Sequence, residues 1–396
     1  MLTLGRRRSA RGTAAVLLAF AAVAPGGAVE AQQTAGAQQV AQANVSKPKK
    51  SPSARMAEPW PDAAKLAERR REAESRRLFQ QADPLVFTLT ADFKAVNRDR
   101  DTTSTKTFPA VLAVTGPAGA SPPLNVALRS RGHLRLDPGN CGFVPLGVDF
   151  VKGDVAGTPF DGQSKLKLVT HCRNDDRYDH LVLREYLAYR LHNLVTPQSF
   201  RVRLARATYV DAASGKTVAT RNAIFLEDKD DVARRMEGRA LSLPRMQFDD
   251  FDQESLTLMM LFQYMIGNTD LSIFTLHNVA MVTTPGSGFH PITWDFDVSG
   301  LVAPPYAIPS PSLGIRSASE RLYRGPCRTL EAFEPSLAIF RAKQAEAMAL
   351  VDSIPGFNER DRREVSAFLG EFFTTLGSTK ALKRELVDRC RKQPAM

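Results

Sequence analysis

The spacing of apolar residues changes along the chain, and each change predicts a different kind of element. From about Leu85, apolar and polar residues alternate in short runs separated by Gly, Pro and Ser, a pattern typical of an antiparallel strand meander. The runs are LVFTLTADF, PAVLAVT, LNVALRSRG, FVPLGVDF and KLKLVT. The period then switches to about 3.6 across YDHLVLREYLAYRLHNLV. This segment is apolar on two sides, so we expect a buried helix.

The second half of the chain begins with another hairpin and continues with helices. SFRVRLARATYVD and TVATRNAIFLE are predicted to pair through the turn 212–215. Asp250 and Gln253 have the spacing of a capping box, which predicts the start of a helix. Its body, ESLTLMMLFQYMI, is apolar all round and should form the centre of a second lobe, ending at Gly267. After Pro304 we expect a Pro-rich loop and three amphipathic helices.

The N-terminus has the three parts of a secretory signal. Four arginines within the first eleven residues precede an apolar run over 14–24, and small residues lead to Ala31. Pro25 interrupts the run well short of the roughly 20 apolar residues that a membrane anchor requires. We therefore expect cleavage near Ala31, export to the periplasm, cell surface or medium, and no transmembrane segment.

Composition divides the remaining chain into four parts. Residues 32–59 are rich in Ala, Gln, Ser, Lys and Pro and are expected to be a disordered tether. Residues 60–83 alternate in charge and should form an exposed lead-in helix. An N-lobe over 84–228 and a C-lobe over 229–396 follow. Together they make one two-lobed α+β unit of about 300 residues, more than a single core commonly holds.

The chain is basic, with a formal net charge of +11 at pH 7. Removal of residues 1–31 takes away four arginines and one glutamate, so the charge falls to +8. This surplus suits an anionic envelope polymer, lipid headgroups, a nucleotide or an acidic protein, or it is only a solvated basic surface. No nucleic-acid partner is expected.

The cysteines predict two disulfides. There are four of them, an even number for an oxidising compartment, and three connectivities are possible. Pairing neighbours in sequence would give Cys141–Cys172 and Cys327–Cys390. No two of the four have the short spacing of a zinc site.

The most informative chemistry follows the second predicted helix. Asn268-Thr269-Asp270 comes first, then His277-Asn278, then a hairpin ending in HPITWDFD. In a strand, residues two apart share a face, so Asp295 and Asp297 should point together while Trp294, Phe296 and Val298 face the core. Two carboxylates without a counterion repel, and Mg²⁺ bound with polyphosphate oxygens would relieve this. Taken singly, each piece is also explained by a capping turn or a structural histidine.

The order of these pieces resembles the CotH kinases and, more distantly, HipA-like and phosphatidylinositol-type kinases. Their catalytic loop reads Asn-x-Asp, followed by a downstream Asn and a metal-binding Asp in an Asp-x-Asp strand. Upstream, LRSRG at 128–132 resembles the Arg-Gly-Asn element of the family, and LVLREYLAYRLHNL resembles its first helix. The hairpin that ends at Glu227 matches as well. The resemblance covers roughly residues 125–300.

The resemblance implies a two-lobed protein-kinase-like fold, with an antiparallel N-lobe sheet, one buried helix and a mainly helical C-lobe. Asp270 would orient or deprotonate an acceptor hydroxyl. The residues implied in cofactor binding are Asn278, Asp295 and Asp297 for Mg²⁺ or Mn²⁺, and Lys165, Lys167, Glu185 and Glu227 for ATP. A lysine held by Glu185 would contact the α- and β-phosphates. The residues themselves leave a second option, in which Glu185 pairs with Arg201 or Arg203.

The sequence also departs from the family. Asn140-Cys141-Gly142-Phe143 stands where CotH proteins carry a Lys-Lys pair, and His277 precedes Asn278 instead of following Asp270. The leading hypothesis is an exported kinase that transfers the γ-phosphoryl of ATP to a protein hydroxyl. The alternatives are an inactive kinase-like envelope protein that binds a ligand, cation or anionic polymer, and a structural surface protein.

Overall fold

The computed structural model describes residues 51–116, 119–151 and 153–392. The expected signal sequence, its cleavage site at Ala31 and most of the expected tether lie outside the described residues. The described chain begins with three short segments, α2 (Pro52–Met56), α3 (Ala63–Glu74) and the 3₁₀ turn η1 (Arg77–Phe79). They precede the first strand.

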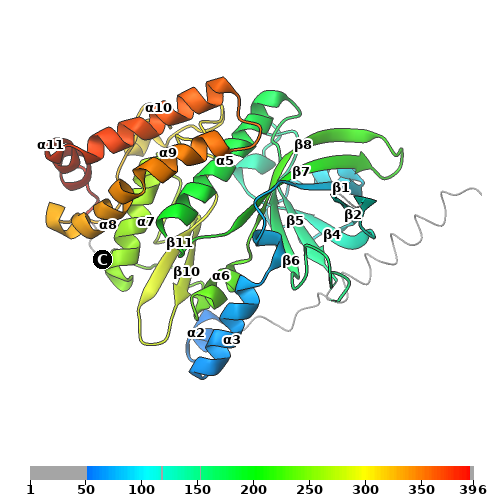
Figure 1. Ribbon diagram of the computed structural model, residues 1–396, viewed down its shortest axis with the longest axis horizontal. Helices are drawn as coiled ribbons and strands as arrows, with labels where there is room; N and C mark the ends of the chain where they lie inside the picture. The colour runs from blue at the N-terminus through cyan, green and yellow to red at the C-terminus, as the bar shows by residue number, and fades with distance from the viewer. Residues whose placement is uncertain (1–50, 117–118, 152, 393–396) are drawn as a thin grey trace, which may run out of the picture.

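Seven strands close into a mixed β-barrel (Figure 1). Their order is β1-β7-β8-β6-β5-β4-β2, and β2 pairs back with β1. The two-residue strand β3 pairs antiparallel with the end of β2. The strands are β1 (Leu85–Ala91), β2 (Phe108–Gly116), β3 (Gly119–Ala120), β4 (Leu124–Ser130), β5 (Leu146–Phe150), β6 (Lys165–Val169), β7 (Val202–Asp211) and β8 (Thr217–Leu226). The short helix α4 (Phe93–Arg98) follows β1.

The barrel encloses a packed core. Alternate residues of β1 point inward, and Phe87 and Leu89 are fully buried. Phe87 and Phe160 each lie 5.3 Å from Phe225 between ring centroids, and Phe150 stacks on Phe160 at 4.9 Å. Aromatic rings bury large apolar areas in such edge and offset contacts. The barrel is therefore a scaffold that presents residues at its rim.

The kinase-like fold expected from the sequence is wrong, because the sheet is closed. The predicted meander is present, since β1, β2, β4, β5 and β6 pair antiparallel in chain order. However, β1 also pairs in parallel with β7, with Leu85 opposite Ala205 and Ala91 opposite Asp211. A kinase N-lobe has an open sheet, whereas this pairing joins both ends of the sheet into a ring. Alternation identifies strands but not partners distant in sequence.

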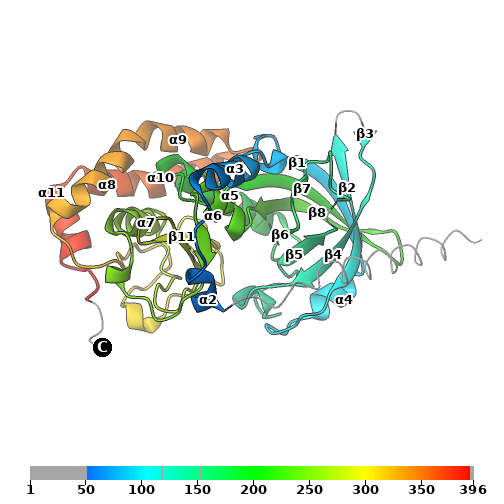
Figure 2. The ribbon, with the colours of Figure 1, turned by 90° about the horizontal axis from the view of Figure 1, so that it is seen from below.

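The predicted buried helix is α5 (Asp176–Val195), which connects β6 with β7. Asp175 caps its first turn by accepting a hydrogen bond from the Tyr178 amide. One side of α5 packs against β7 and β8, and another packs against the later helix α9 (Gln344–Ser353). Helix α5 thus lies between the barrel and the helical part, as both ribbon views show (Figures 1 and 2).

The helical part surrounds a small sheet of order β11-β10-β9. Its helix α7 ends, as predicted, at Gly267 in the left-handed conformation. The predicted N-cap of α7 was wrong, because Asp252 caps this helix and not Asp250. Asp250 instead forms a capping box with Gln247 around η3 (Phe248–Asp250). The elements are α6 (Lys229–Arg235), β9 (Arg239–Leu241), α7 (Gln253–Ile266), β10 (Val279–Thr283), β11 (Phe289–Thr293), α8 (Leu330–Ala342), α9 (Gln344–Ser353), α10 (Glu359–Leu376) and α11 (Thr379–Leu382).

The two predicted disulfides are confirmed. Cys141–Cys172 ties the loop before β5 to the residues after β6, and Cys327–Cys390 ties the loop before α8 to the C-terminal end. Disulfides are compatible with an extracellular protein. None of the helices in the described part of the chain has the length and apolar character needed to cross a bilayer.

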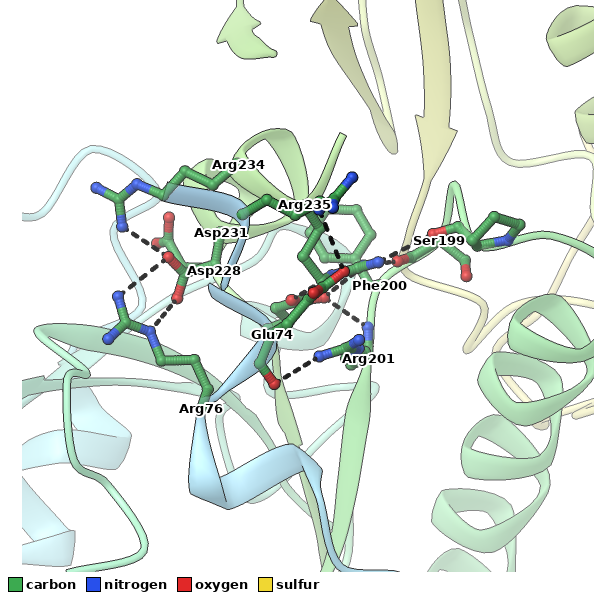
Figure 3. A network of polar contacts seen from close by, with 12 residues as sticks. Glu74, Arg76, Ser199, Phe200, Arg201, Asp228, Asp231, Arg234 and Arg235 are labelled. Atoms are coloured by element: carbon green, nitrogen blue, oxygen red, sulfur yellow. Dashed lines mark hydrogen bonds and ion pairs between the residues drawn. The ribbon is translucent and has the colours of Figure 1, made fainter. Parts of the chain in front are cut away.

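Arginines fasten the N-terminal segment to α6 and, through Arg201 and the Glu74 carbonyl, to the residues before β7 (Figure 3). Arg76 Nε lies 3.0 Å from Asp231 Oδ2 on α6, where Arg234 also binds the same carboxylate. The side chain of Arg239 stacks 4.0 Å from the Trp60 ring centroid and donates to carbonyls of residues 55–59. The last residues of the expected tether therefore pack against β9.

Candidate active site

Two hollows of about 1070 Å³ each open between the barrel rim and the helical part. They meet at a common wall that includes Arg131 and Trp294. We call the first the basic hollow; its charged lining includes Arg129, Lys165, Lys167 and Lys229. We call the second the acidic hollow; its lining includes Glu185, Asp270, Asn278, Asp295 and Asp297. The structure thus brings most of the predicted site residues to one cleft.

The C-terminal end of α7 fixes the loop that carries Asp270. Gly267 adopts φ 64° and turns the chain out of the helix. The buried Asn268 side chain donates to Gln263 Oε1 at 2.8 Å, and its own Oδ1 accepts from the Asp270 amide at 3.0 Å. A buried helix therefore sets the position of Asp270, which is itself half-exposed in the acidic hollow.

Both carboxylate oxygens of Asp270 are held by neighbours in sequence. His277 Nε2 lies 3.1 Å from Oδ1, and Asn278 Nδ2 lies 3.0 Å from Oδ2. The same amide donates to the Asp270 carbonyl at 2.9 Å. The hydrogen bond to Asp270 raises the pKa of His277, although burial acts in the opposite direction. Asn278 has φ 54°, a strained conformation of the kind that concentrates at functional sites.

Asp295 and Asp297 interact, but not for the predicted reason. Strand β11 ends at Thr293 and Asp295 has φ 65°, so strand alternation does not place these side chains. Phe296 is buried as expected, and the Tyr189 hydroxyl accepts from the Asp295 amide at 2.9 Å. Burial and then the charge of Asp295 raise the pKa of Asp297 to about 7, with the Arg135 guanidinium opposing them.

Glu185 reaches the same carboxylates from α5. Burial, followed by the charges of Asp297 and Asp295, raises its pKa well above the ordinary value. Its Oε1 has no hydrogen-bond partner in the described part of the chain. A buried carboxyl oxygen without a partner is costly, so this position favours a bound proton or a cation.

Neither of the two expected pairings of Glu185, with a lysine of β6 or with an arginine at the start of β7, is present among the described residues. Lys165 Nζ lies 3.6 Å from Asp228, and Lys167 Nζ lies 3.0 Å from the centroid of the Trp294 ring. Arg203 donates instead to the Gln81 carbonyl. The backbone amide of Arg201 donates to Glu227 at 2.9 Å. The lysine–glutamate pair and the arginine bridge are thus both absent among residues 51–116, 119–151 and 153–392.

Lys167 and Arg131 form the cationic wall between the hollows. Arg131 lies 5.5 Å from the centroid of the same Trp294 ring that Lys167 covers. Burial and then the charge of Arg131 lower the pKa of Lys167 well below its usual range. An anion beside these two side chains would supply the missing countercharge and stabilise the ammonium form.

Glu227 has a structural role, because both of its carboxylate oxygens are bound by neighbouring residues. Its carboxylate makes a bidentate pair with Arg235, with Oε1 2.8 Å from Nε and Oε2 2.9 Å from Nη2. Oε2 also accepts from the Arg201 amide. The side chain is fully buried although it belongs to the wall of the basic hollow. Its oxygens are therefore engaged in joining β8 to α6.

Several cleft residues were missed by the sequence-based reasoning. Arg135 is buried and donates to the Thr170 carbonyl at 2.5 Å, from which position its charge acts on Asp297 and Glu185. The Tyr306 hydroxyl donates to Asp297 Oδ2 at 3.3 Å. Hydroxyls of the loop before β2 also line the basic hollow, those of Ser104, Thr105 and Thr107. The run TTSTKT was the available signal, and the pairing of Phe108 with Leu128 places its end beside β4.

The acidic hollow fits a cation that brings its own ligands. Within the part of the chain that the structure describes, no group of three or more His, Cys, Asp and Glu side chains is arranged to hold a metal. Mg²⁺ commonly takes only one or two protein carboxylates and completes its shell with water and phosphate oxygens. The Asp295–Asp297 pair, whose repulsion is relieved by a divalent cation, meets that requirement.

Comparison with protein-family models and with curated proteins finds no match to this chain. The resemblance to the CotH kinases therefore stays a prediction from the sequence. What the geometry provides is a basic hollow and an acidic hollow that share one wall at Arg131 and Trp294.

Proposed function

We propose that the cleft transfers the γ-phosphoryl group of ATP, bound with Mg²⁺, to a hydroxyl of a protein. The observation that carries this proposal is the shared wall between the two hollows. Lys167 and Arg131 both lie against the Trp294 ring, Arg131 and Trp294 line both hollows, and Asp295 and Asp297 line the acidic one. In a polyphosphate bound to Mg²⁺, the phosphates would face the basic residues and the cation would face the acidic pair. The resemblance of the Asn-x-Asp loop to the CotH kinases suggests ATP as the donor.

The basic hollow would bind the phosphates. Arg129 is already paired with Asp149 at 2.7 Å, and Lys165 with Asp228. Within the described residues, no carboxylate lies within ion-pair distance of Lys167 or Arg131. These two cations are therefore available to an anion. The hydroxyls of Thr105 and Thr107 add hydrogen-bond partners at the edge of the hollow, whereas the Ser104 hydroxyl already donates to Asp99 at 2.7 Å.

The acidic hollow would position the acceptor. Asp270 accepts the proton of the acceptor hydroxyl as its oxygen bonds to the γ-phosphorus and the bond to the leaving ADP breaks. His277 and Asn278 hold the Asp270 carboxylate in one orientation for this. Asp295 and Asp297 would hold Mg²⁺, which when bound neutralises charge on the phosphate oxygens. Catalysis then depends on positioning and electrostatics.

Transfer of radiolabelled γ-phosphate to a mixture of candidate protein acceptors tests this function. We expect Asp295→Asn to reduce Mg²⁺-dependent labelling by about 100-fold or more, the usual effect of removing one electrostatic contact to a transition state. Asp249→Asn is the matched control, because Asp249 is exposed on η3 and lines neither hollow. Full labelling by the Asp295 variant would rule out the assigned role.

A second candidate is binding without transfer, favoured by the hydrogen bonds that already occupy both oxygens of Asp270. Thermal unfolding with Mg²⁺-ATP distinguishes the two. Ligand at 100 times its Kd stabilises a protein by about 2.7 kcal/mol. Stabilisation without labelling of any acceptor supports a binding protein, whereas no stabilisation at millimolar concentration argues against nucleotide altogether.

A further inference from the structure

The tip of the β10–β11 hairpin carries a serine that lies at the end of a chain of hydrogen bonds. Ser287 Oγ is 2.7 Å from His290 Nε2, and His290 Nδ1 is 2.9 Å from Ser255 Oγ. Ser255 Oγ is in turn 2.7 Å from Asp252 Oδ1. Asp252 caps the N-terminus of α7, so this cluster lies at the opposite end of that helix from Asp270, about 20 Å away along its axis.

The direction of each hydrogen bond follows from the carboxylate. Burial acts to raise the pKa of Asp252, but hydrogen bonds from the Ser255 hydroxyl and amide outweigh it and leave the pKa lowered. An ionised carboxylate only accepts, so Ser255 donates to Asp252 and accepts from Nδ1–H of His290. Nε2 then has a free lone pair and accepts from Ser287. Thr284 Oγ1 donates to Ser287 Oγ at 3.0 Å, which leaves the Ser287 proton directed at the imidazole.

The histidine is sheltered and the serine is accessible. His290 has a side chain only 10% exposed, and burial lowers its pKa although the charge of Asp252 opposes this. The imidazole is therefore neutral at pH 7 and able to accept a proton. Ser287 is exposed, and at the adjacent Gly286 no atom lies within 4 Å of the position a Cβ would take. A reagent can thus approach the hydroxyl from solvent.

We propose that Ser287 is a nucleophile for acyl transfer, with His290 as its general base. A nucleophile within hydrogen-bond reach of a base that a third group orients is the arrangement such chemistry requires. Asp252 acts through Ser255 as a positioning residue. Residues 284–288 line neither hollow and are half-exposed or exposed, so a substrate at Ser287 is open to solvent. The substrate class is accordingly an ester whose acyl group is small or exposed on a larger molecule.

The reaction balances with water as the only co-reactant. Ser287 Oγ bonds to the ester carbonyl carbon while its proton moves to His290 Nε2. The carbon–oxygen bond to the alcohol then breaks, and the alcohol leaves with that proton. Water attacks the acylated serine, giving its proton to Nε2, and Ser287 recovers a proton from Nε2 as the carboxylic acid is released. One ester and one water yield one alcohol and one acid.

Labelling of the full chain with a fluorophosphonate probe, mapped by peptide mass spectrometry, tests the nucleophile. The chain contains its own control: Ser214 is also exposed in a hairpin turn, but it donates to Asp211 at 2.6 Å and has no histidine. We expect Ser287 to be labelled about 100-fold faster than Ser214, the range that a general base provides. Equal labelling of the two serines in the wild-type protein would overturn the assignment, whatever the variants do.

Variants separate chemistry from structure. His290→Gln should bring labelling of Ser287 to the rate of Ser214, and Ser287→Ala should abolish the stoichiometric burst of nitrophenol from p-nitrophenyl acetate. Ser255→Ala should slow the labelling of Ser287 only, while Ser255→Thr, which keeps the hydroxyl, should restore it. An unchanged rate in folded His290→Gln, or a burst retained by Ser287→Ala, would contradict the assignment.

Discussion

Asp297 is the residue whose environment is most at odds with its chemistry. It is buried beside Asp295, and its pKa is raised to about 7. A carboxyl group whose pKa is higher in the folded than in the unfolded state stabilises the fold at low pH. That contribution is complete below the unfolded pKa near 3.8 and is lost as pH rises through 7. The fold therefore retains a group that destabilises it at neutral pH.

Asp297→Asn should remove this pH dependence. One pKa unit corresponds to about 1.4 kcal/mol, so the variant should gain at most about 4 kcal/mol over the wild type between pH 4 and pH 8. Urea unfolding at the two pH values measures the difference. Added Mg²⁺ should stabilise the wild type at pH 8 and leave the variant less affected. Equal pH dependence in both proteins would show that Asp297 is ionised throughout.

At the residue scale, the sequence predicted which acids meet but not what surrounds them. Asp270 follows the end of α7, Asn278 directly precedes β10 and Asp295 follows the end of β11, so short local connections fix their proximity. The surroundings of Glu185 and Asp297 were not predictable. They include Arg135, whose charge acts on both carboxyls from the loop after β4, and Tyr306 of loop 301–329, which donates to Asp297. Neither segment has a periodic pattern.

At the scale of elements, the end of α7 is the part on which the cleft depends most. Gly267 has φ 64°, and a Cβ there would lie 3.1 Å from Phe368 and 3.4 Å from Gly300. A side chain would thus meet both conformational strain and a close neighbour. Since the Asp270 loop begins directly afterwards, any shift of this turn moves the carboxylate.

Gly267→Ala should destabilise the protein by about 1 to 2 kcal/mol. Gly370→Ala is the matched control, because Gly370 lies within α10, where nothing stands within 4 Å of an added Cβ. Removing a glycine from a helix interior stabilises by about 0.5 to 1 kcal/mol. Opposite signs in urea unfolding are the expected result, and a neutral Gly267 variant would remove the argument for a rigid turn.

The elements themselves were largely predictable, because each depends on periodicity and caps that act locally. Helices α5 and α7 and the hairpins β7–β8 and β10–β11 lie where the patterns placed them. The failures were also local. Asp252 rather than Asp250 caps α7, and the chain leaves β11 before Asp295. At the start of α7 a second aspartate was available as the cap, and after β11 a left-handed residue at Asp295 ends the strand pattern.

At the scale of the whole molecule, closure of the barrel was the feature that the sequence did not reveal. Pairing of β1 with β2 is between neighbours, but pairing of β1 with β7 joins Leu85 to Ala205 across most of the N-terminal half. Side chains alternate between the two faces of a strand in the same way in an open sheet and in a closed barrel, so this pattern does not distinguish the two. The number of disulfides was predictable from the even number of cysteines without reference to topology, whereas the fold decides among the three possible pairings.

Loss of the disulfide Cys327–Cys390 should destabilise the whole fold. It closes a segment with a sequence separation of 63 residues, for which the chain-entropy estimate is about 4 kcal/mol. The double variant Cys327→Ser/Cys390→Ser should therefore unfold at distinctly lower urea concentration. The Cys141→Ser/Cys172→Ser variant, with a separation of 31 residues, should lose slightly less. An unchanged midpoint for the first variant would mean that the C-terminal end is held by packing alone.

The parallel pairing of β1 with β7 also sets an order of events during synthesis. A ribosome releases the chain from its N-terminus, so β1 emerges long before Val202–Asp211 exists. Until then one edge of β1 has exposed amide and carbonyl groups, which are ready to pair with any other extended chain. Nascent chains shorter than about 210 residues should for this reason be the aggregation-prone species and the natural clients of chaperones.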